Sequence, residues 1–247
     1  MPAAVIFALL ALWECGVRLS GTPLYILPPP SKVLLAFCSD SPALLRHGAV
    51  TLTETVLGLC IAALLAVIIA VLMDACPLFR KACYPILVVT QTVPVIVLAP
   101  IFIIYMGFGM LPKVVIVVLM CFFPIAIAFS DAMARADEKR VNLVRAMGAG
   151  SFKVYTLVKM PSAAPAFFAG LRVAATYSVS GAVVGEWLSS SSGLGYYMLR
   201  VKNGYMLDKV FASVLMVVLL SLLMNLAVQL LSNLVVKPPK KSGGIKT

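Results

Sequence analysis

Residues 131–161 read DAMARADEKRVNLVRAMGAGSFKVYTLVKMP, a polar and basic stretch that we call the basic insert. It lies between two apolar runs, 114–130 and 163–184, each long enough to cross or nearly cross a lipid bilayer. Apolar residues recur within it at helical spacing, which indicates a folded segment that docks on something in the cytoplasm. Its six basic residues are Arg135, Lys139, Arg140, Arg145, Lys153 and Lys159.

The composition of the whole chain is that of an integral membrane protein. Of its 247 residues, 62% are hydrophobic and only 12% are charged, and the mean hydropathy is +1.06. A soluble domain is typically about half apolar and about a quarter charged. The length fits one transmembrane domain over 1–247 and leaves no room for a separate soluble domain.

The residue content disfavours several other classes of protein. The net charge of +11 sits in short loops and the tail, as the positive-inside bias produces, so no nucleic-acid partner is expected. The six cysteines form no C-x-x-C pair and mostly lie in or beside apolar runs, which is typical of small buried hydrophobes. His47 is the only histidine, and no phosphate-binding loop occurs. We therefore expect no metal site, no cofactor, no ATP site and no enzyme activity in this chain.

Six apolar runs are candidate transmembrane helices, because only hydrogen-bonded helices or closed barrels are stable in hydrocarbon. The third run carries Pro85, Pro94 and Pro100, which predict a kinked or broken helix. The first run has no basic residue before it and no small-x-small cleavage site after it, so a retained span is expected. The runs are 2–19, 56–73 with an extension over 48–55, 83–110, 114–130, 163–184 and 210–236.

The distribution of lysine and arginine orients the chain. With the N-terminus inside, twelve of these residues fall on the cytoplasmic side and seven on the other, including Lys113 in a loop. Both termini, the basic insert and the basic tail 237–247 are then cytoplasmic. The proline-rich segment 20–47 is expected outside the cytoplasm.

Two short amphipathic helices are predicted inside the basic insert. In the first, over 137–147, Val141, Val144 and Met147 recur at helical spacing, and a glycine at 148 ends the helix. Ser151 is predicted to N-cap the second helix.

In this second helix, Phe152, Tyr155 and Val158 are predicted to share one side, and Pro161 begins the next span. Such a hairpin is compatible with an anionic lipid surface. Docking on a protein is the sharper hypothesis.

The spacing of Gly148 and Pro161 resembles the cytoplasmic signature loop of the permeases of ABC importers. That loop follows the pattern E-A-A-x-x-x-G-x(9)-I-x-L-P, and Pro161 stands thirteen positions after Gly148 as the pattern requires. The chain departs from this pattern at residues 142–144, which read Asn-Leu-Val where the family often has Glu-Ala-Ala, and at Met160, which replaces the leucine before the proline.

The resemblance extends over nearly the whole chain and is closest to the nitrate/sulfonate/taurine branch of this family. Residues 27–34, LPPPSKVL, are similar to the LP-x-PS-x-VL segment of that branch. The strings QTVP, GAVVGEW and GLGYYML look most like permeases for hydroxymethylpyrimidine, a thiamine precursor. Further matching stretches are TQTVP at 90–94, LAP at 98–100, GFG at 107–109, GEW at 185–187 and SGLGY at 192–196.

This resemblance implies a fold, a location and a set of partners. The implied fold is an all-α, type I ABC-importer permease with about six transmembrane helices and a cytoplasmic coupling loop at 134–161, in a bacterial inner membrane. The implied complex contains a permease homodimer in the lipid bilayer, two ABC ATPase subunits that bind the ATP, and an extracytoplasmic solute-binding protein. ATP-driven closure of the ATPases would switch the permeases from inward- to outward-facing.

The residues that the resemblance assigns to coupling with the ATPase lie in the basic insert. Apolar contacts by Val144, Met147 and Phe152 would stabilise docking, and Arg145 with Lys153 would orient it. The complete coupling set is Asn142, Val144, Arg145, Met147, Gly148, Ser151, Phe152 and Pro161.

Polar residues inside the apolar runs are candidates for the solute pathway, because polar groups are costly in hydrocarbon. A tyrosine in such a pathway could stack on a flat pyrimidine. Ordinary hydrogen bonding between helices is the alternative explanation. The pathway candidates are Gln91, Thr92, Pro94, Tyr177 and Ser178.

Three charged residues in or near the spans have other expected roles. Glu54 and Glu186 are expected near the outer membrane boundary as solvated end charges, with contact to the binding protein as the alternative. Arg172, inside the fifth run, is expected to be paired or to extend its charge toward the membrane surface.

The predicted function is the import of a small solute. The best match is hydroxymethylpyrimidine or a related thiamine precursor, followed by sulfonate, taurine or nitrate. A stand-alone secondary transporter or channel is the main alternative, which the basic insert and the lack of a convincing inverted repeat disfavour. A membrane-embedded enzyme has little support, because no cluster of histidines, paired acids or reactive cysteines is visible.

Overall fold

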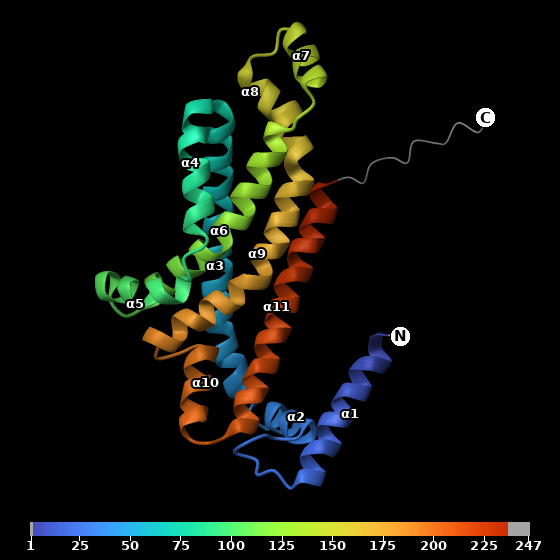
Figure 1. Ribbon diagram of the computed structural model, residues 1–247, viewed down its shortest axis with the longest axis vertical. Coiled ribbons are helices and arrows are strands. Elements are labelled where there is room, and N and C mark those ends of the chain that lie inside the picture. The colour runs from blue at the N-terminus through green and yellow to red at the C-terminus, as the bar shows by residue number, and fades with distance from the viewer. Residues whose placement is uncertain (1, 237–247) are drawn as a thin grey trace, which may run out of the picture.

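The computed structural model describes residues 2–236, except for the side chains of residues 2, 3 and 189. The basic tail predicted at 237–247 therefore lies outside the described residues. All regular elements of the described part are helices (Figure 1). They are α1 (Pro2–Ser20), α2 (Pro30–Ser39), α3 (Ser41–Ala75), α4 (Pro77–Thr90), α5 (Val95–Met106), α6 (Met110–Ala134), α7 (Glu138–Ala146), α8 (Ser151–Val154), a π-helical turn (Tyr155–Lys159), α9 (Met160–Ser189), α10 (Leu194–Asn203) and α11 (Leu207–Val235).

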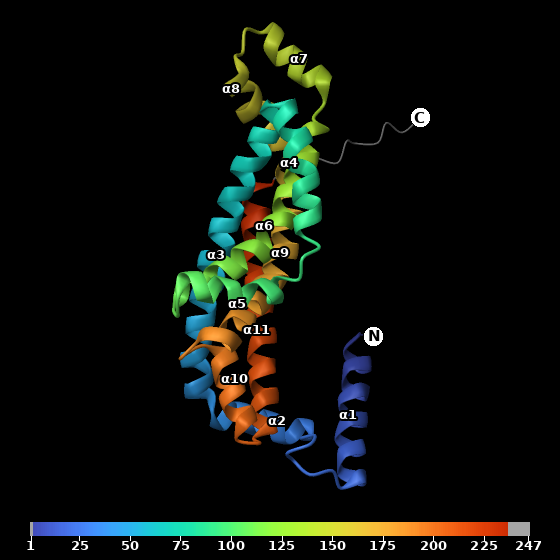
Figure 2. The same ribbon diagram turned by 60° about the vertical axis from the view of Figure 1, so that its left-hand side comes forward.

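Four of the described helical segments are long and apolar enough to cross a membrane: α3, α6, the continuous segment Ser151–Leu188 and α11. The pair α4 and α5 makes a fifth span if the two are counted together. The first expected run, 2–19, forms α1, which is helical but is not among these spans. In both views α1 stands apart from the bundle, and it contacts α2 and, through Trp13, Phe211 of α11 (Figures 1 and 2).

The core of the bundle is formed by α3, α6 and α9, which pack closely because small residues line their contacts. A Cβ added at Gly58 of α3 would come within 2.5 Å of Val117 on α6. A Cβ at Gly170 of α9 would come within 2.8 Å of the carbonyl oxygen of Pro124. Buried alanines continue these contacts along the helices: Ala62, Ala66, Ala70, Ala126, Ala174, Ala175 and Ala182.

The third apolar run is broken, as its prolines predict. Helix α4 ends at Thr90, and α5 begins at Val95 after a bend of 100°. Pro94 precedes α5 with extended backbone (ψ 115°), and a proline has no N–H with which to continue α4. As a result α5 lies across the bundle instead of along it (Figures 1 and 2).

The two ends of the bundle carry different structures. Helices α7 and α8 project beyond one end, which we call the α7 end (Figure 1). Helices α2 and α10 and the turn between α9 and α10 lie toward the other, the α10 end. The segment 20–47, expected outside the cytoplasm, is at the α10 end, opposite the basic insert.

Candidate functional site

The basic insert folds as a helical hairpin made of α7, α8 and the π-helical turn. Asp137 caps α7 by accepting a hydrogen bond from the backbone N–H of Lys139 at 2.9 Å. Gly148 ends this helix with φ +83°, a left-handed conformation that glycine adopts without steric cost. The position of the turn is therefore the one that the sequence predicts.

The hairpin has a small apolar core of its own. Val141, Val154 and Val158 are buried together, and Val144 packs against them. Because the inner faces of both arms are occupied in this way, the remaining apolar side chains point outward. Met147 and Phe152 are 79% and 80% exposed, and with Leu143 and Leu157 they form a surface that we call the apolar tip.

Ion pairs and hydrogen bonds fix the base of the hairpin to the bundle. Asp74, near the end of α3, accepts hydrogen bonds from the Tyr155 hydroxyl at 2.7 Å and from Lys159 Nζ at 2.5 Å. Arg80 of α4 pairs with Asp131 of α6 at 3.1 Å. The hairpin is thus anchored by hydrogen bonds to the end of α3, and the Arg80–Asp131 pair joins α4 to the end of α6, although sequence reasoning assigned no role to Asp74 or Asp131.

Two predictions about the second arm of the hairpin are wrong. Ser151 does not cap α8: Gly150 occupies the N-cap position and no side chain caps the helix. Phe152 does not share a side with Val158, because Phe152 is exposed while Val158 is buried. The wider π-helical turn over 155–159 shifts the faces of the helix, and the sequence pattern assumed regular α-helical spacing.

The other predicted coupling residues occupy the hairpin as follows. Asn142 and Arg145 are exposed and border a cavity of about 310 Å³ between α7 and the end of α6. Pro161 lies in the first turn of α9, directly after the π-helical turn, and begins no new span because the helix is continuous from Ser151.

A second cluster of polar side chains holds the N-terminus of α10. The first backbone N–H groups of a helix lack partners within the helix. Here Gly193 N–H donates to His47 Nδ1 at 3.1 Å and Leu194 N–H donates to Thr51 Oγ1 at 2.9 Å. Gly195 N–H donates to Glu186 Oε2 at 2.6 Å. We call this arrangement, which joins α3, α9 and α10, the α10 clasp.

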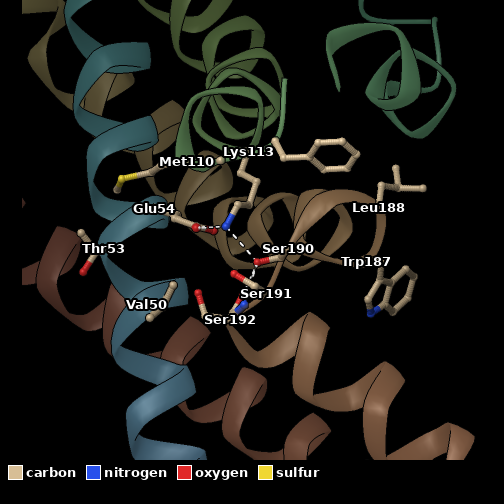
Figure 3. Close-up of a pocket in the computed structure, with 12 residues that line it drawn as sticks. Val50, Thr53, Glu54, Met110, Lys113, Trp187, Leu188, Ser190, Ser191 and Ser192 are labelled. Carbon is tan, nitrogen blue, oxygen red and sulfur yellow. Dashed lines mark hydrogen bonds and ion pairs between the residues drawn. The ribbon is translucent and has the colours of Figure 1, made fainter. Parts of the chain in front are cut away.

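A buried ion pair lies next to the clasp. Lys113 Nζ of α6 pairs with Glu54 of α3 and donates to Ser190 Oγ at 3.0 Å (Figure 3). Glu186 accepts a further hydrogen bond from Thr51 Oγ1 at 2.7 Å. The side chains of these charged residues are almost completely removed from solvent: Glu54 and Glu186 are each 1% exposed and Lys113 is 4% exposed.

The expectation that Glu54 and Glu186 are solvated end charges is therefore wrong, as is the assignment of Lys113 to a loop. These residues lie where the three core helices pack together, so each carboxylate is stabilised by fixed donors and not by water. One sequence signal was available, because Lys113 and Glu54 are charges of opposite sign within long apolar helices, separated in sequence from the other charged residues there, Arg46, Asp74 and Asp131.

The ion pair borders an open cavity of about 690 Å³ at the α10 end. Figure 3 shows Lys113 and Glu54 at its centre, with Ser190, Ser191 and Ser192 on one side. Further lining residues include Val50, Thr53, Met110, Trp187 and Leu188.

Three of the five pathway candidates lie together. Gln91, Pro94 and Tyr177 line a cavity of about 350 Å³ between the α4–α5 bend, α6 and α9. Thr92 is exposed, and its hydroxyl donates to the carbonyl oxygen of Val89 at 2.7 Å. Ser178 is buried and donates to the carbonyl oxygen of Ala175 at 2.8 Å, so neither residue lines this cavity.

Comparison with known proteins defines the class of this protein. Residues 58–237 match the family described as binding-protein-dependent transport system inner membrane component. The MetNI methionine ABC transporter, in an inward-facing conformation, has a chain with the same fold: its TM-score is 0.61 at 18% identity, covering 79% of this chain and 95% of that one. The fold is thus that of a type I ABC-importer permease.

Two curated relatives are similar to this chain over most of their length, and both are permeases. A probable ABC transporter permease protein of Haemophilus influenzae is 34% identical over 217 residues, which are 88% of this chain and 89% of the relative. The formylaminopyrimidine transport permease protein ThiX of Halalkalibacterium halodurans is 34% identical over 219 residues, which are 88% of this chain and 87% of the relative. The chain belongs to the binding-protein-dependent transport system inner membrane component family and is the permease subunit of an ABC importer.

Proposed function

We propose that this permease imports a thiamine-precursor pyrimidine, and that the basic insert connects it to a separate ATPase. The observation that carries the coupling role is the apolar tip. It is formed by exposed side chains on a hairpin that has its own buried core and is fixed to the bundle. Exposed apolar side chains on a rigid projection are typical of a surface that another protein covers.

The hairpin fits the role of a coupling helix because it is stiff from tip to base. Movement of Phe152 passes directly into α9, since the helix is continuous from Ser151 to Leu188. Movement of the π-helical turn passes to the end of α3 through Asp74, which accepts hydrogen bonds from Tyr155 and Lys159. Closure of an ATPase dimer that binds one permease state better would then shift the permease between its two states.

The proposed complex has two copies of this permease, two ATPase subunits and an extracytoplasmic binding protein. The family description names binding-protein dependence and the inner membrane. In this arrangement the α7 end faces the cytoplasm with both chain termini, and the α10 end faces the binding protein. Thr92 and Ser178 remain predicted pathway residues beside Gln91, Pro94 and Tyr177.

The proposed solute class rests on the transport named for one relative and on the chemistry of the cavity. ThiX, 34% identical to this chain, is a formylaminopyrimidine permease. Tyr177 offers an aromatic face and Gln91 offers an amide donor and acceptor at one cavity, which suits a flat ring that carries both donors and acceptors.

The test is ATP-dependent uptake by proteoliposomes that contain the permease with its ATPase and binding protein. Labelled hydroxymethylpyrimidine is compared with labelled taurine, each with and without ATP. We expect ATP-dependent uptake of the pyrimidine only. Uptake of taurine alone would assign the permease to the sulfonate branch, and ion-gradient-driven uptake without an ATPase would favour a secondary transporter.

A further inference from the structure

Arg172 lies near the middle of the bundle with an exposed side chain. It lies two residues after Gly170, which packs on Pro124 and Ile125 near the middle of α6. One turn further along α9, Thr176 accepts a hydrogen bond from Asn225 Nδ2 of α11 at 3.0 Å. Both ends of α9 are at least about three helical turns away from Arg172.

Arg172 has no carboxylate partner among the described residues. The chain has nine acidic residues, and none lies at this depth of the bundle. A second copy would bring the same nine carboxylates at the same levels, so it would not supply an ion-pair partner either. The acidic residues are Glu14 in α1, Asp40, Glu54, Glu186 and Asp208 toward the α10 end, and Asp74, Asp131, Asp137 and Glu138 at the α7 end.

The side chain is also too far from the ends of the bundle to bring its charge to the membrane surface. In a helix the Cα–Cβ bond tilts toward the N-terminus, so Arg172 extends toward Met160. Those twelve residues rise about 18 Å, which exceeds the length of an arginine side chain. A charged group inside a membrane protein that is neither paired nor at the surface must face water.

The exposed face of α9 is polar from Arg172 toward the α10 end, whereas Pro165, Ala169 and Val173 are exposed apolar residues before or beside Arg172. Thr176 and Ser180 follow at one-turn intervals, and the adjacent Tyr177 reaches the cavity that contains Gln91. The exposed face of α3 between Val56 and Leu72 is different, because apart from Cys60 it is aliphatic and suits contact with lipid. Its exposed residues include Leu57, Ile61, Leu64, Leu65, Ile68 and Leu72.

We propose that Arg172 faces the water-filled solute pathway and makes it selective for uncharged or anionic solutes. This inference rests on the proposed function, which supplies the pathway. A fixed positive charge repels a cation and attracts an anion over several ångströms, most strongly in a narrow space with low-dielectric walls. Uncharged pyrimidines and anionic sulfonates are therefore allowed to pass. Cationic solutes with a quaternary nitrogen are repelled.

The position of Arg172 is tested by thiol labelling in membranes. The six native cysteines are replaced by serine or alanine in the full-length chain, and R172C is compared with L64C on the aliphatic face of α3 and with A174C in the core. Because thiol labelling proceeds through the hydrated thiolate, R172C is expected to react at least about tenfold faster than either control with soluble methanethiosulfonates.

The charge effect is tested at Thr176, one turn or about 6 Å from Arg172. T176C is labelled with methanethiosulfonates that carry either a sulfonate or a trimethylammonium group, and each rate is divided by the rate for a free thiol. Replacing Arg172 by Gln is expected to lower the ratio of anionic to cationic labelling about tenfold, while Arg172→Lys retains the ratio.

The two labelling measurements test the position of Arg172 and its effect on selectivity separately. An R172C thiol that stays unreactive with and without ATPase and ATP, or that only cross-links to a second copy, overturns the pathway position. A ratio at T176C that is unchanged by R172Q overturns the selectivity. The uptake assay of the unmodified complex is separate, so absence of ATP-dependent uptake would refute the proposed function and not the position of Arg172.

Discussion

At the scale of single residues, the intact ion pair between Lys113 and Glu54 strongly affects the stability of the membrane domain. Both charges are removed from water, which costs several kcal/mol for each ion, and their mutual attraction offsets this only when the pair is intact. Glu186 adds a second buried carboxylate, which Thr51 and the Gly195 N–H stabilise. Loss of either partner of the pair leaves a buried charge without compensation.

Replacing Lys113 by methionine is therefore expected to lower the free energy of unfolding by about 3–5 kcal/mol. The double variant E54Q/K113M should be clearly more stable than K113M alone, because the unpaired carboxylate is removed as well. Unfolding in detergent by heat or denaturant, analysed as a double-mutant cycle, measures this coupling. Strictly additive effects of the two substitutions would contradict the buried pair.

Position 193 requires a glycine for two independent reasons: its backbone conformation has a positive φ, and a side chain there would have no space. Its φ is +104°, and a Cβ at this position would overlap the carboxylate of Glu186. We expect Gly193→Ala to destabilise the protein by more than about 2 kcal/mol, through strain and through displacement of the clasp.

Gly107 is the matched control for this substitution. It also has a positive φ, +75°, but a Cβ there would meet nothing within 4 Å. Gly107→Ala should cost only the strain of the backbone conformation, about 1–3 kcal/mol, and clearly less than Gly193→Ala, which adds the overlap with Glu186. Equal losses of thermal stability in the two alanine variants would show that the clasp contributes nothing.

At the scale of elements, the apolar tip of the hairpin predicts a separation of binding from stability. Met147 and Phe152 are exposed, so M147D/F152D should leave the melting temperature within about 1–2 °C of the parent protein. Binding of the ATPase should fall at least about tenfold, because the apolar contacts that the tip offers are lost.

Co-purification and titration with the ATPase measure the binding of this variant. Val154→Asp is the control, since Val154 is buried in the hairpin core and its substitution should unfold the hairpin itself. Full ATPase binding by M147D/F152D would refute docking at the tip.

Gly148 allows a second test of coupling, directed at the turn between the two arms. Its φ of +83° disfavours β-branched residues, so Gly148→Val should distort the turn and displace the apolar tip. We expect ATP hydrolysis to continue while uptake falls. Gly148→Asn should remain active, because asparagine tolerates the left-handed conformation, and unchanged uptake by the valine variant would argue against the coupling role.

The sequence predicts some elements well and others poorly, for physical reasons. The α4–α5 break follows from Pro94, and the end of α7 follows from Gly148, because these residues act through local backbone geometry. The π-helical turn over 155–159 has no such local signal. The buried pair of Glu54 and Lys113 joins residues 59 positions apart, so their burial depends on the packing of α3 against α6, which a linear pattern does not contain.

At the scale of the whole molecule, Asp40 joins the segment 20–47 to the rest of the α10 end. Its carboxylate accepts a hydrogen bond from the Tyr197 hydroxyl and pairs with Lys209 Nζ at 3.1 Å. The Tyr197 hydrogen bond, followed by Lys209, holds the pKa of Asp40 below its usual value of 3.8. Burial, with Asp40 as a further cause, raises the pKa of Tyr197.

These shifts define the pH range over which the contact stabilises the protein. Because the pKa of Asp40 is lower in the folded state, its contribution is fully present above pH 3.8 and is lost as the pH falls through the lowered value. Asp40→Asn should cost about 1–2 kcal/mol at pH 7. The difference between variant and parent should disappear at the acid end of a melting-temperature series, and a difference that persists there would contradict the ionic contact.

The continuous helix from Ser151 to Leu188 has a mechanical consequence for the transporter as a whole. Its 38 residues extend about 57 Å if regular, from the apolar tip to within a few residues of the α10 clasp. A continuous helix of this kind transmits thrust and rotation along its length, and its irregular points are the π-helical turn beside the hairpin and the internal Pro165. In the proposed coupling mechanism, work done on Phe152 at the α7 end is delivered as displacement of Trp187 at the α10 end, so the two ends of the permease share one moving part.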